Sequence, residues 1–362
     1  MTSYASAAGR PGSGAGVGAD AAVNLYSDTQ TRPSEAMLAA MSRAPVGDEQ
    51  RFADPTVNEL CERVAELLGH EAAVFLPTGT MCNAIGFRLH LRAGGEEVLL
   101  HRLAHPVVAE TGSPAALCGT TLNPIDSEDG TFGAEELRGA LHPGEDRYMP
   151  RSRLLSVEQT ANLTGGRVWL LERMREVVGA AREAGLRTHL DGARLMNAVV
   201  ASGVPAAEWA GQFDTAWIDF SKGLGAPIGA CLAGSEELIE EAWRHKQMLG
   251  GAMRQAGVVA AAALYGLDHH VERLAEDHAR ARRLADGFAA IEGIEVDPGK
   301  VETNIVIFRV SDAEVFQREM AERGVSVGAL GVSHGRAITH LDIDDAGVER
   351  AIEAAAEAVG AR

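Results

Sequence analysis

The stretch from Thr188 to Pro227 constrains the fold of this chain more than any other. It contains two short apolar runs that each end near a charged side chain followed at once by glycine, Asp191 before Gly192 and Lys222 before Gly223. A strand delivers a side chain in this way to the carboxyl edge of an open α/β sheet, where such sheets hold their ligands. The interval between the two residues suits one crossover unit between parallel strands. The segment therefore predicts an α/β sheet that presents Asp191 and Lys222 side by side.

An acid and a lysine at one sheet edge are the two groups that a pyridoxal 5'-phosphate (PLP) site requires. The acid meets the pyridine nitrogen of the cofactor, and the lysine amine meets its aldehyde. Taken singly, Asp191 is an ordinary strand-end acid and Lys222 an ordinary surface lysine. The presence of both residues, each surrounded by small residues, makes a cofactor site as plausible as this ordinary interpretation, judged from these residues alone.

Length and charge limit the class of protein. With 362 residues the chain fits two domains, a large and a small one. Its net charge is −18 and its Lys and Arg residues are scattered, which disfavours a nucleic-acid surface. No apolar run approaches the roughly 18 residues that a membrane helix requires, so we expect neither a nucleic-acid nor a membrane partner.

Cysteine usage and the N-terminal tract bear on location. The four cysteines lie in apolar sequence without paired spacing, as expected of reduced core residues in a cytoplasmic protein. They have no clustered His or Cys neighbours, so we expect no metal site. Residues 1–23 are rich in Gly, Ala and Ser and lack the basic start and apolar core of a signal peptide. That composition predicts a disordered tail.

A turn of small residues, Gly79 and Thr80, lies between a predicted strand over Ala72–Leu76 and a helix predicted from about Met81. Such a turn offers free backbone N–H groups and the positive end of a helix dipole, which is the outline of a phosphate site. Any strand-to-helix turn can contain the same residues. Its position one unit into an α/β sheet favours the phosphate interpretation.

Four further polar residues have two interpretations each. Ser27 lies in a polar run that either reaches a ligand or forms a plain turn. His105 either covers a flat cofactor ring or is a loop histidine with local partners, and His101 shares this choice. Arg254, on a glycine loop before an alanine-rich helix, either binds a phosphate or pairs with an acidic neighbour. Arg336 is predicted to begin a strand, where its guanidinium is a candidate clamp for a substrate carboxylate.

The order of the predicted elements divides the chain. A large domain is expected over residues 24–270, with strands and helices alternating as in a parallel sheet. Helices, short strands and a final helix predict a small α+β domain over residues 271–362.

With these segments in place, the chain resembles the threonine aldolases, which belong to the aspartate-aminotransferase-like (fold type I) PLP enzymes and to the β-eliminating lyase group. The matching segments run in family order from Asn24 to the C-terminus: S-D-T-Q-T-R-P-S, A-P-V-G-D, D-P-T-V-N-E-L, E-A-A-V-F-L-P-T-G-T, H-L-D-G-A-R-L-M-N-A, S-K-G-L-G-A-P-I-G, G-G-A-M-R-Q-A-G and T-H-L-D-I. The resemblance implies a large PLP-binding domain with a mostly parallel seven-stranded sheet and a small C-terminal α+β domain. It also implies a homotetramer whose active sites use both subunits of a dimer.

The resemblance further implies roles for matching residues. Lys222 would attach PLP covalently, and Asp191 would keep the pyridine nitrogen protonated so that the ring accepts electrons. The other implied roles are phosphate binding by Gly79, Thr80 and Arg254, ring stacking by His105, and binding of the substrate α-carboxylate by Ser27, Arg194 and Arg336. The implied reaction is aldol cleavage of a threonine-like β-hydroxy-α-amino acid to glycine and an aldehyde, and its reverse.

Two positions depart from the family pattern. In the segment Glu158–Asn162, Ala161 stands where the family usually has a histidine that helps to position the substrate hydroxyl. Alanine neither forms a side-chain hydrogen bond nor takes a proton. Arg51 stands where the family has the tyrosine of a Tyr-Gly-Asp-Asp-Pro turn. We therefore expect an aldehyde portion that is not acetaldehyde-sized or not neutral, with His105 or an ordered water as the base.

Two other functions compete with this one. The first is a PLP-dependent β-eliminating lyase or an aminotransferase-like enzyme, because the same Lys and Asp pair serves reactions at several bonds. The second is a non-catalytic PLP-fold binding protein, which the intact Lys222 and Asp191 disfavour.

Overall fold

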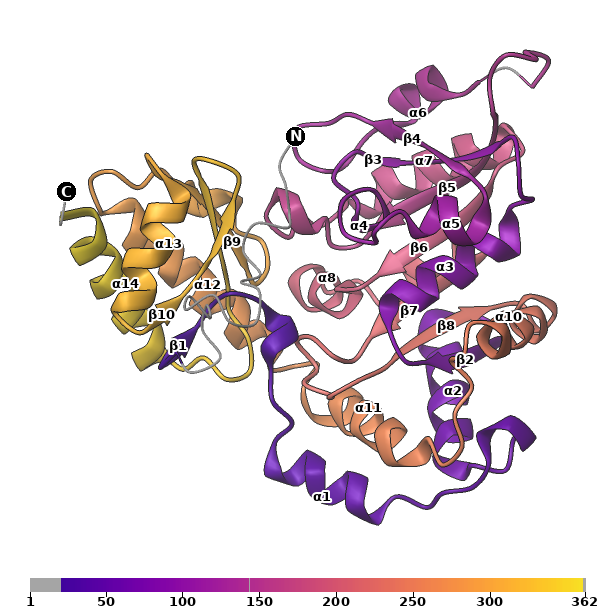
Figure 1. The fold of residues 1–362 in the computed structure, drawn as a ribbon, viewed down its shortest axis with the longest axis horizontal. Helices are drawn as coiled ribbons and strands as arrows, with labels where there is room; N and C mark the ends of the chain where they lie inside the picture. Colours follow the sequence, from indigo (N-terminus) through magenta and orange to yellow (C-terminus); the bar gives the residue numbers. More distant parts are fainter. Residues whose placement is uncertain (1–20, 143, 361–362) are drawn as a thin grey trace.

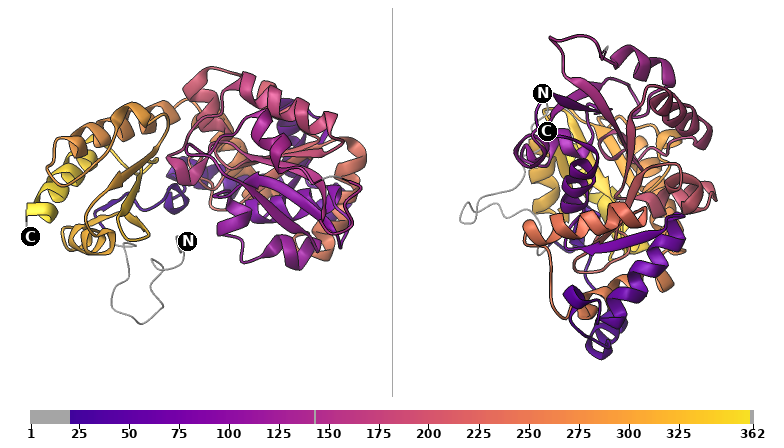
Figure 2. Two further views of the ribbon diagram at one scale, coloured as in Figure 1. Left: turned by 90° about the horizontal axis from the view of Figure 1, so that it is seen from above. Right: turned by 90° about the vertical axis from the view of Figure 1, so that its right-hand side faces the viewer.

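The computed structural model describes residues 21–142 and 144–360, which form a larger and a smaller part lying side by side (Figures 1 and 2). The larger part is built on one seven-stranded sheet in the order β2-β8-β7-β6-β5-β3-β4. Only β8 runs antiparallel to its neighbours β2 and β7 within this sheet. The predicted mostly parallel seven-stranded sheet is therefore confirmed. Its strands are β2 (Ala72–Leu76), β3 (Glu96–His101), β4 (Thr121–Ile125), β5 (Arg151–Glu158), β6 (Arg187–Gly192), β7 (Thr215–Asp219) and β8 (Ala230–Gly234).

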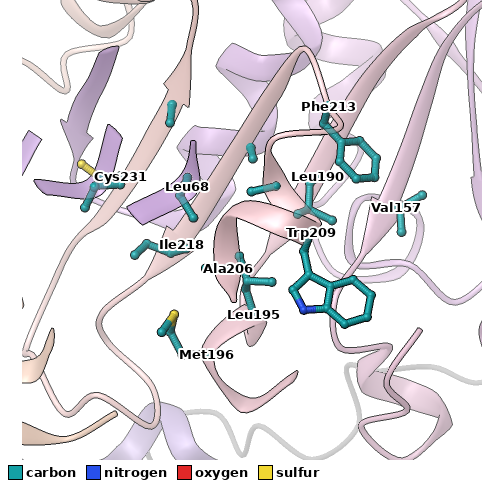
Figure 3. Close-up of a cluster of buried hydrophobic side chains, with 14 of the residues drawn as sticks. Leu68, Val157, Leu190, Leu195, Met196, Ala206, Trp209, Phe213, Ile218 and Cys231 are labelled. Atoms are coloured by element: carbon teal, nitrogen blue, oxygen red, sulfur yellow. The ribbon is translucent and has the colours of Figure 1, made fainter. Parts of the chain in front are cut away.

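Helices cover both faces of this sheet, which is why β7 and β8 are buried along their whole length. Successive side chains of a strand point to opposite faces. In β7, Ala216 and Ile218 join the core under α2, α7, α9 and α11, whereas Trp217 joins the core under α3 and α10. Figure 3 shows the first of these cores, where Trp209 and Phe213 lie near Leu190. The helices of this part are α1 (Glu35–Arg43), α2 (Pro55–Leu68), α3 (Gly79–His90), α4 (His105–Val108), α5 (Ser113–Cys118), α6 (Ala134–Ala140), α7 (Leu171–Glu183), α8 (Leu195–Ser202), α9 (Ala206–Ala210), α10 (Glu236–Met248) and α11 (Gly257–His269).

Local sequence signals set the helix ends. The hydroxyls of Ser34 and Ser235, at the N-cap positions, accept from the third N–H of α1 and α10. Helix α2 begins at Pro55 and ends at Gly69, whose φ of 71° is the left-handed conformation that glycine adopts without strain. Helix α3 begins at Gly79, two residues before the predicted start, because the Thr78 hydroxyl caps it by accepting from the N–H of Met81.

The smaller part has its own core and a three-stranded antiparallel sheet in the order β11-β12-β9. The predicted small α+β unit is thus present in the structure. Arg336 lies in the middle of strand β12 instead of beginning it. The elements are α12 (Leu274–Ala289), β9 (Ile305–Arg309), α13 (Ala313–Glu322), β10 (Val325–Ser326), β11 (Gly328–Leu330), β12 (His334–Ile338) and α14 (Asp345–Gly360).

The N-terminal segment belongs in space to the smaller part. Strand β1 (Val23–Asn24) pairs in parallel with β10, and Leu25 is buried in the core of this part. Most of the tail predicted over residues 1–23 lies outside the described residues, and its last residue, Val23, is already in β1. Beyond Leu25 the chain crosses to the larger part, which brings Ser27 and Asp28 to the carboxyl edge of the seven-stranded sheet.

Two further observations concern the cysteines and the helices. All four cysteines, Cys61, Cys82, Cys118 and Cys231, are free thiols. Across residues 21–142 and 144–360, every helix is too short or too polar to cross a bilayer.

Candidate active site

A cavity of about 310 Å³ lies at the carboxyl edge of the large sheet. This volume is within the range of small-molecule sites. Seven of the predicted site residues line it, namely Ser27, Gly79, Thr80, His105, Asp191, Arg194 and Lys222. Other polar or aromatic residues that line it are Thr29, Thr78, Asn83, Glu158, Asn162, Trp217, Asp219 and Ser221.

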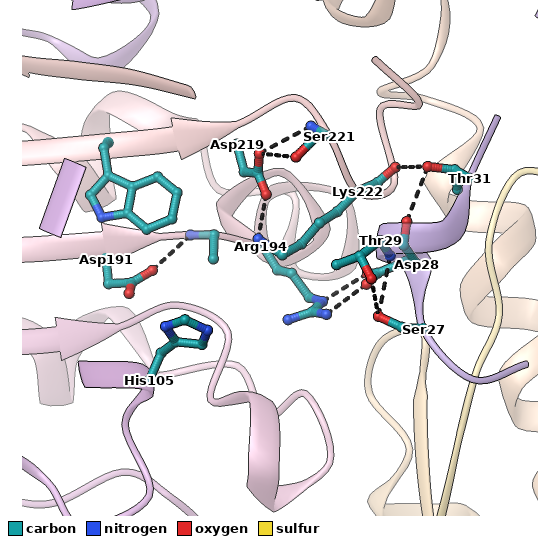
Figure 4. Close-up of polar contacts among 12 residues, drawn as sticks. Ser27, Asp28, Thr29, Thr31, His105, Asp191, Arg194, Asp219, Ser221 and Lys222 are labelled. Atoms are coloured by element: carbon teal, nitrogen blue, oxygen red, sulfur yellow. Dashed lines mark hydrogen bonds and ion pairs between the residues drawn. The ribbon is translucent and has the colours of Figure 1, made fainter. Parts of the chain in front are cut away.

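Three neighbouring parallel strands create this convergence. Strand β5 ends at Glu158, β6 carries Asp191 and β7 ends at Asp219, three residues before Lys222. Because β5, β6 and β7 pair in parallel, their carboxyl ends meet at one edge. Figure 4 shows Asp191, Asp219 and Lys222 gathered there, with Arg194 beside them.

Asp191 is buried and held by defined donors. Its carboxylate accepts from the side-chain amide of Asn83 at 2.8 Å and from the N–H of Ala193 at 3.0 Å. Burial raises the pKa of Asp191, while the Asn83 hydrogen bond and the nearby His105 act in the opposite direction, and the net shift is upward. A cationic group placed against this carboxylate would stabilise its charged form.

Asn83 orients this acid. Its amide nitrogen donates to Asp191 and, also at 2.8 Å, to Glu110, while its oxygen accepts from the indole N–H of Trp217 at 2.8 Å. Glu110 in turn lies 2.8 Å from Nδ1 of His105. One helix residue therefore fixes both the predicted ring-nitrogen partner and the predicted stacking histidine. Asn83 was not predicted, since an asparagine inside a helix has no distinguishing sequence pattern.

His105 is the first residue of α4 and faces the cavity close to Asp191 (Figure 4). Burial lowers its pKa, but the hydrogen bond with Glu110 and the charge of Asp191 outweigh this effect, and the net shift is upward. His101, the alternative, does not line the cavity. Its ring lies 3.2 Å from the carbonyl oxygen of Ser127, as expected of a histidine with a local partner.

Lys222 is held by an acid that the sequence did not single out. Its amine forms an ion pair with Asp219, whose carboxylate also accepts from the N–H and the hydroxyl of Ser221. Its carbonyl oxygen accepts from the Thr31 hydroxyl at 2.9 Å. The run D-F-S-K, with an acid three residues before the lysine, was the available signal for Asp219.

Arg194 forms a buried fork-to-fork pair with Asp28. Nε and Nη2 of Arg194 donate to the two oxygens of Asp28 at 2.8 and 2.6 Å, and the side chains are 4% and 0% exposed. Burial raises the pKa of Asp28, but the charge and hydrogen bonds of Arg194 dominate and hold it well below its usual range. The amide of Asn304 adds a third donor at 3.1 Å.

The turn at Gly79 and Thr80 has the features of an anion site. At the start of α3, the N–H groups of Met81 and Cys82 bond to Thr78. Within the described ranges no hydrogen bond engages the N–H groups of Gly79 and Thr80, and both residues line the cavity. A Cβ atom at Gly79 would overlap the Trp217 ring, which explains why glycine is needed at this position.

Four predicted site residues do not line the cavity. Arg254 has a 65% exposed side chain and pairs with Asp48 at 3.2 Å. Arg51 is exposed in the neighbouring short helix Glu49–Arg51. Arg336 is buried in β12, with Nη1 3.4 Å from the side-chain oxygen of Asn162, which does line the cavity. Ala161 is buried and borders a separate cavity of only about 10 Å³.

The sheet, the small C-terminal part and the lysine and acid at the sheet edge together define the architecture of the fold type I PLP enzymes. Within that class, the chain belongs to the β-eliminating lyase family, which it matches over residues 24–312.

Individual relatives make the similarity more specific than the family does. The chain is 40% identical over 324 residues to the low specificity L-threonine aldolase of Escherichia coli K12, covering 89% of this chain and 94% of that protein. It is 38% identical over 328 residues to low-specificity L-threonine aldolase 1 of Arabidopsis thaliana, covering 89% and 92%. The fold is similar to that of the Leishmania major threonine aldolase, with a TM-score of 0.81 at 20% identity over 93% of this chain and 99% of that one.

The Asp28–Arg194 pair yields a prediction about stability. Asp28→Asn removes the carboxylate that is paired with the buried Arg194 guanidinium, so the free energy of unfolding should fall by about 3–5 kcal/mol in urea titrations. The matched control is Asp268→Asn, which removes the partner of Arg63 in a pair whose side chains are 40% and 45% exposed. That change should cost below about 1 kcal/mol. Equal losses in the two variants would contradict the importance assigned to the buried pair.

Proposed function

We propose that this chain is a PLP-dependent aldolase that cleaves a threonine-like β-hydroxy-α-amino acid to glycine and an aldehyde, and that catalyses the reverse. The observation that carries the proposal is the convergence of Lys222, Asp191 and the Gly79–Thr80 turn on one cavity. The names of the E. coli and Arabidopsis relatives support the reaction assigned to it. Four free cysteines support a cytoplasmic location as part of the same proposal.

The residues of the cavity fit PLP group by group. Lys222 is the amine for covalent attachment, and Asp191, oriented by Asn83, suits the pyridine nitrogen. The unengaged N–H groups of Gly79 and Thr80 suit the phosphate. When bound there, PLP supplies an electron sink for a bond at the substrate Cα.

The chain's own residues would bind and orient the amino acid. Arg194, held in one orientation by Asp28, turns its planar guanidinium to the cavity and suits the two oxygens of an α-carboxylate. The Ser27 hydroxyl oxygen accepts from the N–H and the hydroxyl of Thr29, which leaves its own proton to donate to the same carboxylate. Arg336 lies behind Asn162 and supports this side of the cavity. His105, fixed by Glu110, would cover the cofactor ring.

The substrate preference forms a second element of the proposal. Ala161 offers no proton-exchanging group, and Arg51 lies at the surface beside Arg254. We therefore expect the preferred aldehyde portion to differ from acetaldehyde in size or charge. Kinetics on L-threonine and L-allo-threonine that match those of ordinary threonine aldolases would count against this element alone.

Incubation with a panel of β-hydroxy amino acids tests the reaction. Wild type should release glycine and an aldehyde and should show the visible absorbance of attached PLP. Lys222→Ala should lose both, because no other lysine lines the cavity as described. Lys300→Ala, which removes an exposed lysine elsewhere, is the matched control and should behave as wild type. A keto acid and ammonia as products would favour elimination instead, and a wild type without PLP absorbance would reject both enzyme functions.

The third element is assembly into a homotetramer in which Arg254 of one copy completes the phosphate site of another. Arg254 is exposed and remote from its own cavity, yet its loop is firmly held. Glu49 donates its backbone N–H to the Arg254 carbonyl and accepts through its side chain from buried Lys246 at 2.9 Å. Large apolar side chains are exposed on the surrounding elements, namely Leu38, Val46, Phe52, Met248 and Val258. An apolar surface of this kind suits an interface between copies.

Sedimentation and cofactor titration test the assembly. Phe52→Asp places a charge in the apolar surface and should shift the wild-type tetramer towards smaller species. Val332→Asp changes an exposed valine of the smaller part and should leave assembly intact. Arg254→Gln should weaken PLP binding without changing assembly. A wild type that sediments as a monomer, or an Arg254→Gln variant with unchanged PLP affinity, would contradict this element.

A further inference from the structure

Glu158 is a carboxyl group of the cavity that no hydrogen bond holds within the described residues. It lines the cavity but is only 9% exposed. The other two carboxylates of the cavity are engaged, Asp191 by Asn83 and Ala193, and Asp219 by Ser221 and Lys222. A buried acid without partners costs free energy, so its retention in a ligand cavity points to chemistry.

Strand register places Glu158 beside the cofactor position. It is the last residue of β5 and pairs directly with Asp191 of β6. Neighbouring strands lie about 4.8 Å apart, so two cavity-facing side chains at paired positions are close neighbours. On its other side Glu158 borders the small cavity that Ala161 also lines.

The groups around Glu158 set its protonation. Burial raises its pKa and the charge of Asp191 adds to this, while His105, Arg194 and Lys222 act in the opposite direction. These groups face it from β6, from α4, from the segment after β6 and from the segment after β7. The result is a pKa of about 8. A carboxyl that titrates near the working pH suits general acid–base catalysis.

We propose that Glu158 is the catalytic residue that exchanges a proton with the substrate β-hydroxyl, the role for which Ala161 offers no side chain. This inference rests on the proposed aldolase function. It assigns to Glu158 the proton transfer for which the sequence suggested His105 or an ordered water, and it leaves His105, held by Glu110, to cover the cofactor ring.

The proton and electron balance of the step is complete. In cleavage, the hydroxyl O–H bond breaks and its proton passes to the Glu158 carboxylate. The C=O bond of the aldehyde forms, and the Cα–Cβ bond breaks with its electron pair remaining on the Cα side. The Cα then takes up one proton, so glycine and the aldehyde together contain the atoms of the substrate. In synthesis, the protonated Glu158 donates to the new alkoxide.

Glu158→Gln tests this role, since the amide keeps the shape but exchanges no proton with an alkoxide. With PLP bound, kcat for aldol cleavage should fall by about 100-fold or more, with KM and PLP stoichiometry close to wild type. The wild-type kcat should rise with pH up to about 8, where the carboxylate form becomes populated, and this limb should vanish in the variant. Glu158→Asp, which restores a carboxyl, should recover part of the rate together with the pH limb.

Glu97→Gln is the matched control. Glu97 is a buried carboxyl on β3, in the same sheet, outside the 310 Å³ cavity. This variant should keep the wild-type rate and pH profile. A loss equal to that of Glu158→Gln would show a general effect of buried carboxyl replacement and would overturn the proposal.

A second measurement does not depend on activity. Infrared difference spectra of the full chain without PLP, wild type minus Glu158→Gln, should contain one carboxyl band that titrates near pH 8. A band that titrates near the ordinary glutamate value of about 4.3 would overturn the proposal, as would a Glu158→Gln variant within about threefold of wild-type kcat. Loss of PLP from that variant would assign Glu158 to cofactor binding and would also overturn it. If wild type cleaves no member of the panel of β-hydroxy amino acids, the proposed aldolase function itself is wrong. That result differs from the outcomes above, in which wild type is active and the Glu158→Gln variant decides the role of Glu158.

Discussion

Compensation of buried charge at one sheet edge is the constraint on which the rest of this structure depends. The parallel order of β5, β6 and β7 places three carboxylates, a lysine and an arginine within one covered cavity. In such a setting each charge has to be paired, hydrogen-bonded or neutralised by a proton. Arg194 is paired with Asp28, Lys222 with Asp219, and Asp191 is held by Asn83. Glu158 has neither an ion-pair partner nor a hydrogen bond within the described residues, which leaves the third of these solutions, a retained proton.

The sequence was informative where the determinants are local. Glycine after an apolar run marks a strand end and a turn of small residues marks a helix start, so the sheet edge at Asp191 and the start of α3 were predicted closely. Asp191 and Lys222 were found because both follow such runs. The residues that were missed act through contacts between distant segments, as Asn83 does with Asp191 and Trp217. A side chain whose role depends on contacts with residues distant in the sequence leaves no recognisable pattern in the linear sequence.

Arg254 shows the same limit in a different form. The glycine loop that carries Arg254 was recognisable in the sequence. The two interpretations of Arg254, phosphate binding and pairing with an acidic neighbour, stayed open because a sequence does not show which groups a side chain contacts. In the folded chain Arg254 pairs with Asp48 on an exposed surface. The neighbouring pair of Glu49 and Lys246 is fully buried and bonded to the same loop, so contacts within the single chain hold the loop in place.

The path of the N-terminal segment has a mechanical consequence. Leu25 is bonded to Ser326 and Ile338 of the smaller part, whereas Asp28 and Thr31 are bonded to Arg194 and to the Lys222 carbonyl of the larger part. Residues 25–31 thus form a short tether between the two parts, anchored at both ends. Asp28 also accepts from the side-chain amide of Asn304 in the smaller part, so a movement of that part away from the cavity would pull on the carboxylate that orients Arg194. The orientation of the Arg194 guanidinium at the cavity is therefore linked to the position of the smaller part.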